Sequence, residues 1–595
     1  MTDVDGPADA ATSLALAQPE DSHSKAEWEA AAAAVLRKTR KMTDADPDAL
    51  VWDKLTHATL DGIAIPPLGV AGAPEPAVRP SRVGGWDIRA LVSHSEAKLA
   101  NEEALVDLDG GVTSLWVAAD ETTDVAAVLA GVLLDLAPVV LDAPTVPTEA
   151  ARALLAYADE RGLDLHPDSN LGADPLGAML RELPLAVDEA VAELRDLAAQ
   201  AKAARVRAIV VDATAAHDLG ASDVQELAWS VAVGVAYLRW LTDHGFDLAD
   251  AADLIEFRYA ATDEQFPTIA KLRAARQLWA SVLQHSGLPA DVDVAQRQHA
   301  VTSRPMLSKY DPYVNMLRGT VAAFAAGVGG ADAITVLPFD AALGRPEAFG
   351  RRIARNVSHL LIDESHVAAV ADPAGGAYAV EQLTADLAAA GWAAFQQLEE
   401  EWEGGHDLTP FRERIAAAVA ERERQVARRR RPLTGVTEFP NLAEVLPVRD
   451  ADPLNDRAAR YGASFEAMRD EPAATPVFLA TLGTVAQHTA RATFASNLFA
   501  AGGIAVEVAG PTAGVDELLA SYAGQPVVCL AGNDVAYAEW GAAAVEALRG
   551  AGAQHVIIAG VSTSSTTDIF EVVDDSCALG VDALAFLTAT REKLS

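Results

Sequence analysis

The stretch RAIVVDATAAHDLGASDVQELAWSVAVGVAYLRWLTD, residues 207–243, decides the fold class of this 595-residue chain. It opens with RAIVVDA (207–213), a short run with the apolar, β-branched composition typical of a buried strand. A long helical pattern, DVQELAWSVAVGVAYLRWLTD (223–243), follows after a short connection. A strand followed directly by a helix is the repeating unit of α/β folds with a parallel sheet.

The same unit recurs on both sides of this stretch, between about residues 90 and 390. Further expected strands are SLWVAA (114–119), VVLDA (139–143), LIEFRYA (254–260), HAVTSR (299–304) and AITVLP (333–338). Ala-rich helical patterns separate them. This alternation predicts a (β/α)8 TIM barrel over residues 89–431, in which reacting groups would lie at the carboxyl ends of the strands.

The first 88 residues differ from the barrel in composition. Residues 1 to about 24 are expected to form a tail, and Ser24 is expected to begin a helix. One stripe of that helix would carry Trp28, Ala32, Val35 and Leu36. The stretch 51–88 is rich in Pro and Gly and predicts an extended arm, lying on the barrel or on a partner.

The last part of the chain predicts a second domain. The run ERERQVARRRRP (421–432) is interpreted as a solvated helix end rather than an anion or CoA contact. A linker over 432–474 follows it. Residues 475–595 predict a doubly wound α/β domain. Its expected strands are PVFLATL (476–482), IAVEVAG (504–510), PVVCLAG (526–532), HVIIAGV (555–561) and VDALAFL (581–587).

Charge and cysteine content narrow the function classes. The net charge of −39 disfavours binding to a phosphate backbone. Two cysteines, Cys529 and Cys577, exclude a disulfide framework and a Cys-rich metal site. The N-terminus lacks the pattern of a signal peptide, and no apolar run is long enough to span a membrane. A cytoplasmic location is therefore expected, with no membrane or nucleic-acid partner.

Four segments resemble the methylmalonyl-CoA mutase family. They are VWDKLTHATLDGIAIPPL (51–68), IAKLRAARQLWASV (269–282), PYVNMLRGTVAAFAAGVGGADAITVLPFD (312–340) and IARNVSHLLIDESHVAAVADPAGGAYAVEQLT (353–384). The resemblance implies that the second domain is flavodoxin-like and of the cobalamin-binding type. It also implies a complex in which adenosylcobalamin lies against the barrel and coenzyme A threads it. The implied reaction is the radical interconversion of methylmalonyl-CoA and succinyl-CoA.

The cobalamin positions that the resemblance assigns are degenerate in this chain. Catalytic members of the family carry Asp-x-His-x-x-Gly after the first strand of this domain, with the His as the cobalt ligand. Here Val485, Gln487 and Ala490 stand at those positions, and His488 is one place off. Two further loops differ: Val528 replaces a Ser, and Ala559-Gly560 replaces Gly-Gly. His488 is interpreted as structural or solvent-facing.

The positions that the resemblance assigns to substrate binding also lack the polar side chains expected there. The family resemblance implies a His on the strand that here reads Thr335, Val336, Leu337, Pro338, none of which offers an imidazole. Arg89 and His94 could meet CoA phosphates, although surface or partner contacts are favoured. Arg258 and Tyr259 are expected at the end of a barrel strand, as a polar plug in an unused barrel mouth rather than as remnants of an acyl-CoA site.

These losses predict a chain with no catalytic, cofactor-binding or metal-binding residues of its own. The resemblance is thus to the small, non-catalytic (beta) subunit of the actinobacterial type. Such a subunit would form a heterodimer with a large catalytic subunit, which binds adenosylcobalamin and the acyl-CoA. One alternative is an independent cobalamin-dependent acyl-CoA mutase or isomerase with altered cofactor binding. A cobalamin-repair GTPase chaperone is a further possible partner.

Overall fold

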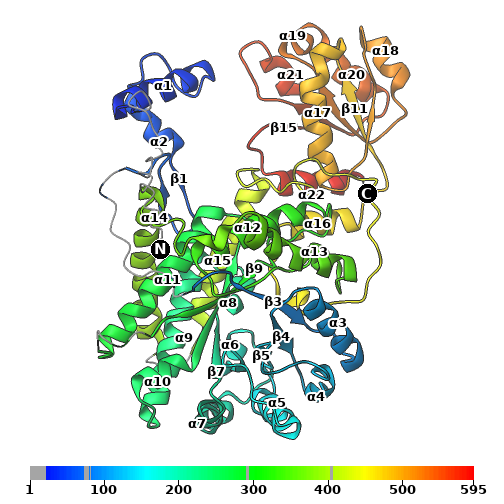
Figure 1. Ribbon diagram of the computed structural model, residues 1–595. Coiled ribbons are helices and arrows are strands. Elements are labelled where there is room, and N and C mark those ends of the chain that lie inside the picture. The colour runs from blue at the N-terminus through cyan, green and yellow to red at the C-terminus, as the bar shows by residue number, and fades with distance from the viewer. Residues whose placement is uncertain are drawn as a thin grey trace, which may run out of the picture. The chain divides into compact units, whose positions relative to one another are not determined.

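A computed structural model describes residues 22–70, 72, 80, 82–289, 292, 294–402 and 407–594 (Figure 1). The chain divides into two compact units, residues 1–71 and 72–595. Most of the tail expected over residues 1 to about 24 lies outside the described residues. No helix within the described part is long and apolar enough to cross a membrane.

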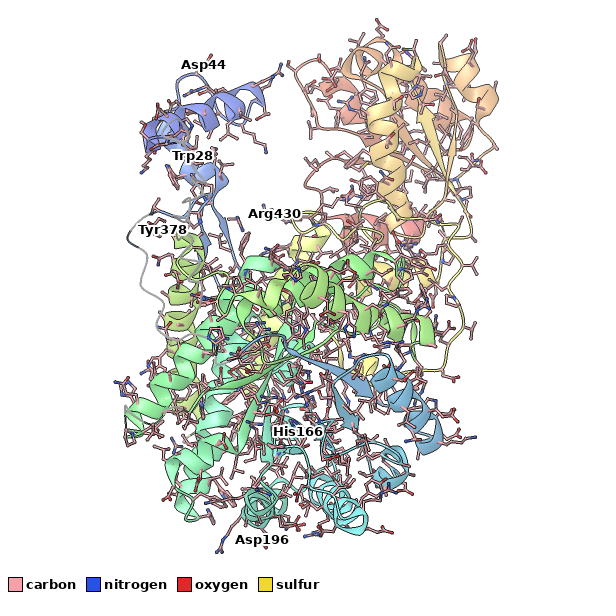
Figure 2. The ribbon with its side chains drawn as sticks, viewed as in Figure 1. Trp28, Asp44, His166, Asp196, Tyr378 and Arg430 are labelled. Carbon is pink, nitrogen blue, oxygen red and sulfur yellow. The ribbon has the colours of Figure 1, made fainter. Side chains whose placement is uncertain are left out.

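The N-terminal unit is a small helical cluster with a hairpin. Its elements are α1 (Lys25–Lys38), α2 (Val51–Leu55) and the antiparallel pair β1 (His57–Ala58) and β2 (Ala64–Ile65). Ser24 caps α1 in a capping box with Glu27, which confirms the expected helix start. Trp28, labelled in Figure 2, packs against Trp52 with 4.8 Å between ring centroids. Val35 is exposed, so the expected stripe is wrong at that position.

Eight parallel strands close into a barrel, which confirms the expected TIM fold. They are β3 (Asp87–Val92), β4 (Ser114–Ala118), β5 (Val139–Asp142), β6 (Asn170–Ala173), β7 (Arg207–Asp212), β8 (Ile255–Ala261), β9 (Arg297–Thr302) and β10 (Ala333–Thr335). Pairing of Ala333 with Asp87 and of Ile334 with Ile88 closes the ring. The expected barrel start at residue 89 is wrong by two residues, because it falls inside β3.

Two barrel strands, β3 and β6, are absent from the sequence-based prediction. Charged Asp87 and Arg89 interrupt the apolar pattern of β3, because they face the barrel interior rather than solvent. The short β6 contains Gly172 at φ 76°, where the register with β7 shifts. A Cβ at Gly172 would lie 2.0 Å from the Leu141 carbonyl oxygen, so the close approach of β5 requires glycine.

Helices cover the outside of the barrel. They are α3 (Ala97–Asp109), α4 (Val125–Val128), α5 (Pro147–Arg161), α6 (Pro175–Leu180), α7 (Val187–Ala204), α8 (Thr214–Asp218), α9 (Asp223–Asp243), α10 (Leu248–Asp253), α11 (Gln265–His285), α12 (Val314–Gly329), α13 (Ala348–His359), α14 (Tyr378–Trp402) and α15 (Thr409–Ala427). The expected helix over 223–243 is α9, and a capping box of Ser222 with Gln225 begins it.

The basic run 421–432, which spans the end of α15, is not wholly a solvated helix end, so that interpretation is wrong in part. Arg422 donates to the carbonyl oxygens of Gly220 and Ala221. Arg429 donates to the Thr437 carbonyl, and Arg431 forms an ion pair with Glu264. Only some of the run is exposed, as at Arg430, labelled in Figure 2. The arginines therefore fasten α15 to the barrel and to the linker.

The C-terminal domain is a five-stranded parallel sheet in the order β12-β11-β13-β14-β15, the flavodoxin-like arrangement. Its strands are β11 (Val477–Thr481), β12 (Val506–Val508), β13 (Val527–Ala531), β14 (His555–Ala559) and β15 (Asp575–Cys577). Its helices are α17 (Val485–Ala501), α18 (Val515–Ser521), α19 (Asp534–Ala536), α20 (Ala542–Gly550), α21 (Thr567–Val572) and α22 (Ala583–Leu594), while α16 (Ala463–Asp470) precedes the sheet.

The expected fifth strand, VDALAFL (581–587), is wrong. Most of it belongs to α22, and the fifth strand is the more polar segment Asp575–Cys577. The buried residues of α22 follow a helical spacing: Ala583, Phe586, Leu587, Thr590 and Leu594. A short apolar run does not distinguish a buried strand from a buried helix, which explains the error.

Candidate functional site

The first loop of the C-terminal domain is replaced by the start of a helix. Thr484 caps α17, whose first residue is the exposed Val485. Gln487, at the position that the resemblance assigns to a cobalt ligand, accepts hydrogen bonds from Thr484 N (2.8 Å) and Thr484 Oγ1 (2.9 Å). Gln487 therefore completes a capping box and points back at the helix end. Ala490 lies exposed on the same helix.

His488 is buried on α17 rather than solvent-facing. Its Nδ1 lies 3.2 Å from the Gly483 carbonyl oxygen, to which it donates. The structural interpretation of this residue therefore agrees with its contacts. A shift of the motif by one residue, which would put His488 at the ligand position, puts Ala486 at the Asp position and Arg491 at the Gly position, so no carboxylate supports the imidazole from there.

The two other positions that the resemblance assigns to the cobalamin site lie in the sheet. Val528 is buried in the middle of β13, opposite Phe478 on β11. Ala559 is the buried last residue of β14, and Gly560 N donates to the Cys577 carbonyl. Val528 and Ala559 thus belong to the apolar packing on the two faces of the sheet.

Two residues that sequence reasoning missed fill the carboxyl edge of this sheet. Tyr537 is buried, and its hydroxyl lies 2.7 Å from the Ala559 carbonyl oxygen and 3.1 Å from that of Leu530. Arg491 lies over the Tyr537 ring, 4.8 Å from its centroid. The guanidinium donates to the Gly532 carbonyl and to Asp534, both at 2.6 Å.

Arg491 also lies against Gly560. A Cβ at Gly560 would lie 3.0 Å from Arg491 Nε, so the guanidinium packs directly on that backbone. The loops after β13 and β14 are therefore joined by side chains of this chain. The signal was present in the sequence, since Arg491 stands where a shifted family motif would place its Gly.

The barrel axis is filled by a second cluster, centred on Arg258. Because side chains alternate along β8, Arg258 faces the interior and Tyr259 faces α9, where its hydroxyl bonds Ser230. Arg258 Nη1 lies 3.1 Å from Asp212 Oδ2, and its guanidinium carbon lies 4.1 Å from the Trp116 ring centroid. The interpretation as a polar plug therefore agrees with the position of Arg258, which lies inside the barrel. It is wrong for Tyr259, which points outward to α9.

The Asp212 carboxylate pairs with two guanidinium groups of this cluster. Arg181 Nη2 lies 2.6 Å from the same carboxylate that Arg258 contacts. Burial alone would raise the pKa of Asp212, but these two guanidinium groups lower it to about 2. The carboxylate is therefore ionised and fully paired.

A histidine on β9 contacts β10, the strand on which the resemblance implies an acyl-binding histidine in catalytic members. The segment Thr335–Pro338 carries no imidazole, but His299 on β9 lies with Nε2 2.8 Å from Thr335 Oγ1. Its Nδ1 accepts from Arg258 Nε at 3.2 Å, so Nε2 carries the proton. Burial and the nearby arginines hold the pKa of His299 well below its usual value. Both ring nitrogens are thus occupied within the protein.

Arg89 lies inside the barrel, so the expected surface or phosphate contact is wrong. Its Nη1 lies 2.5 Å from Glu256 Oε1, and both side chains are fully buried. Asp87 and Ser114 accept its remaining hydrogen bonds. His94 lies half-buried after β3, where its Nδ1 accepts from Glu96 N.

The linker lies across the carboxyl ends of the barrel strands. Arg304 reaches Asn455 Oδ1 at 3.2 Å, and Asn455 Nδ2 donates to the Ala341 carbonyl at 2.7 Å. Ala459 N donates to the Asp218 carbonyl. Beneath this segment remains a cavity of about 40 Å³, bordered by Trp116, Asp212, Ser303, Leu337, Leu454 and Arg457. It has room for about one water molecule.

One trio of residues at this mouth resembles a nucleophilic triad. His217 Nε2 lies 2.7 Å from Ser303 Oγ, but its Nδ1 is 3.6 Å from Glu226, beyond hydrogen-bonding distance. Glu226 is held instead by Lys271 Nζ at 2.5 Å. The trio is buried beside a cavity that fits no acyl substrate, so it is a structural cluster. Within the described residues, no group of three His, Cys, Asp or Glu side chains could hold a metal ion.

Comparison with known proteins identifies the family. The sequence model of methylmalonyl-CoA mutase matches residues 106–520. The methylmalonyl-CoA mutase small subunit of Streptomyces virginiae is 43% identical, over 98% of both chains. That of Propionibacterium freudenreichii subsp. shermanii is 34% identical, over 98% of this chain and 97% of the relative. The methylmalonyl-CoA mutase of Escherichia coli is 31% identical, over 46% of this chain and 38% of its own length. The chain belongs to the methylmalonyl-CoA mutase family, in which it resembles the actinobacterial small subunits.

Proposed function

We propose that this chain is the structural small subunit of a heterodimeric, adenosylcobalamin-dependent methylmalonyl-CoA mutase of the cytoplasm. The complex would interconvert methylmalonyl-CoA and succinyl-CoA, with cofactor and acyl-CoA bound by a homologous large subunit. The filled barrel axis carries this proposal: Arg258, Trp116 and His299 occupy it, and the cavity above them measures about 40 Å³. Ligand sites for molecules of this size measure about 300 Å³ or more.

The residues of the C-terminal domain do not fit cobalamin. A lower cobalt ligand needs an imidazole held by a polar partner. Gln487 caps a helix at that position, and the neighbouring His488 is buried against the Gly483 carbonyl. Arg491 and Tyr537 bridge the loops at the carboxyl edge of the sheet. No step of the reaction is therefore assigned to this chain.

The contribution of the chain would be a rigid, homologous surface for the catalytic subunit. Obligate complexes bury apolar faces that either chain alone would expose to water. The names of the relatives from Streptomyces virginiae and Propionibacterium freudenreichii, each a small subunit, support a larger partner. Docking of a cobalamin-repair GTPase stays a prediction.

Spectroscopy and assay of the purified chain test the proposal. The chain alone should leave the absorbance spectrum of adenosylcobalamin unchanged and should not convert methylmalonyl-CoA. Adding the large subunit of the same organism should produce a stable 1:1 complex with activity. Turnover by this chain in the absence of any partner would instead establish the independent mutase.

A further inference from the structure

The outer helices of the barrel differ in how much apolar surface they expose. Among large hydrophobic residues, Tyr313 and Leu317 on the α12 side are 66% and 69% exposed. Phe349 and Leu360, at the two ends of α13, are 47% and 49% exposed. By contrast α5, α7 and α9, all of whose residues are described, expose no large hydrophobic side chain. The α12–α13 side is therefore one apolar sector of the barrel, while Leu133, Leu136, Phe266 and Tyr378 are exposed elsewhere on it.

This sector is continuous. Because β10 pairs with β3, the helices α12, α13 and α3 follow one another around the barrel (Figure 1). Tyr313 stacks on Phe339 at 5.3 Å between centroids, and Phe339 meets Phe349 edge-on at 5.9 Å. These contacts link the exposed rings of α12 and α13 into one surface. Val106 on α3 extends the surface on the other side.

A groove of about 480 Å³ runs between α13 and α3. Phe349, Ala348 and Val106 give it an apolar lining, and Arg351, Arg352 and Arg355 lie along the α13 side. Arg351 and Arg355 are both paired with Asp107. Arg352 is exposed over the Phe349 ring, 5.4 Å from its centroid, and forms no ion pair with any described residue.

We infer that the surface formed by α12, α13 and the α13–α3 groove is the docking face for the large catalytic subunit. Exposed aromatic residues next to an arginine are the composition typical of interface hot spots. The inference rests on the proposed function and identifies the surface through which this chain would bind the large subunit. The partner would present apolar side chains to Leu317 and Phe349, and a carboxylate to Arg352.

Charge favours a different chain over a second copy of this one. Each copy carries a net charge of −39, so self-association would bring two strongly acidic chains together. Arg352 lies over the Phe349 ring and forms no ion pair with the described residues, so a carboxylate of another chain would complete its contacts. A second copy and this chain's own N-terminal unit are alternative occupants that the experiment separates.

Two variants with matched controls test the inference. In the full chain, Leu317→Glu and Arg352→Glu should each raise the Kd for the large subunit of the same organism about 30-fold or more, measured by titration calorimetry. Leu136→Glu, at 67% exposure beside β5, and Arg195→Glu, exposed on α7, should leave the Kd unchanged. Since all four positions are exposed, the thermal unfolding midpoint of each variant should match that of the unmodified chain.

The outcomes separate this inference from the proposed function. If the unmodified chain does not bind the large subunit, the proposed function fails. If it binds and neither Leu317→Glu nor Arg352→Glu weakens binding, only the docking face is wrong. Sedimentation of the isolated chain as a dimer that Leu317→Glu dissociates would assign the face to a second copy. Chemical cross-links from the N-terminal unit to α12 or α13 in the monomer would assign the face to that unit.

Discussion

Arg258 lies over Trp116 on the axis of the barrel, with 4.1 Å between the guanidinium carbon and the ring centroid. The same arginine reaches Asp212 at 3.1 Å and His299 at 3.2 Å, so one side chain joins three strands. Catalytic barrels leave reactive groups free at the carboxyl ends of their strands. In this barrel the polar side chains at the strand ends bond one another, and they fill the interior as a network of buried charged groups.

Replacing Arg258 should therefore cost stability. Arg258→Leu leaves the buried Asp212 with Arg181 as its remaining close cation, and breaking a buried pair costs about 3–5 kcal/mol. Arg239→Leu is the matched control, because Arg239 also lies 3.1 Å from its carboxylate, Glu399, but is mostly exposed. That control should lose no more than about 1 kcal/mol in urea unfolding. Equal losses in both variants would contradict the assigned role of the buried network.

The sequence predicts the fold class because both domains are built from regular repeats. Six of the eight barrel strands are recognisable from apolar runs such as that of 207–213. Strand β3 is hidden because the charged Asp87 and the buried Arg89 are held by Ser114 and Glu256. Pairing of this kind depends on contacts more than 150 residues apart, as between Arg89 and Glu256, which no local pattern encodes.

The candidate site, like the fold, is predictable from the sequence only in part. The sequence predicts the loss of cobalamin-site residues at Val485, Gln487 and Val528, because each differs in chemical type from the residue that the resemblance assigns there. The contacts that occupy these positions in the folded chain cannot be predicted from the sequence. The contact of Arg491 with Tyr537 joins α17 to the segment after β13, and only the folded sheet brings those two together.

Asp174 should make stability depend on pH. It is buried beside Tyr237, and burial raises its pKa from the ordinary value to about 7. Between about pH 4 and pH 7 the folded chain would hold a proton that the unfolded chain releases, so stability should fall as pH rises through this window. Asp174→Asn should reduce that fall in thermal unfolding midpoints measured between pH 5 and pH 8. The exposed control Asp164→Asn should not, and an unchanged slope in Asp174→Asn would contradict the assignment.

Arg429 should hold the linker to the end of α15. It donates to the Thr437 carbonyl at 3.0 Å and lies over Phe494 of the C-terminal domain. Arg429→Ala should speed proteolytic cleavage between residues 432 and 460 several-fold, because local opening becomes easier. The adjacent Arg430→Ala removes an exposed arginine and should leave the rate unchanged. Equal rates in the two variants would mean that other contacts hold the linker.

Restoring the family motif should not restore cobalamin binding. Val485→Asp with Gln487→His recreates the lost Asp and His, but Arg491 and Tyr537 still join the loops after β13 and β14. Gln487→His also removes the N3 side chain of the capping box at the start of α17. The spectrum of added adenosylcobalamin should stay unchanged in this double variant, while a cobalamin-binding mutase serves as positive control. A spectral shift in the double variant would show that the motif alone limits binding. A shift that needs Arg491→Gly as well would assign the loss to the guanidinium that fills the site.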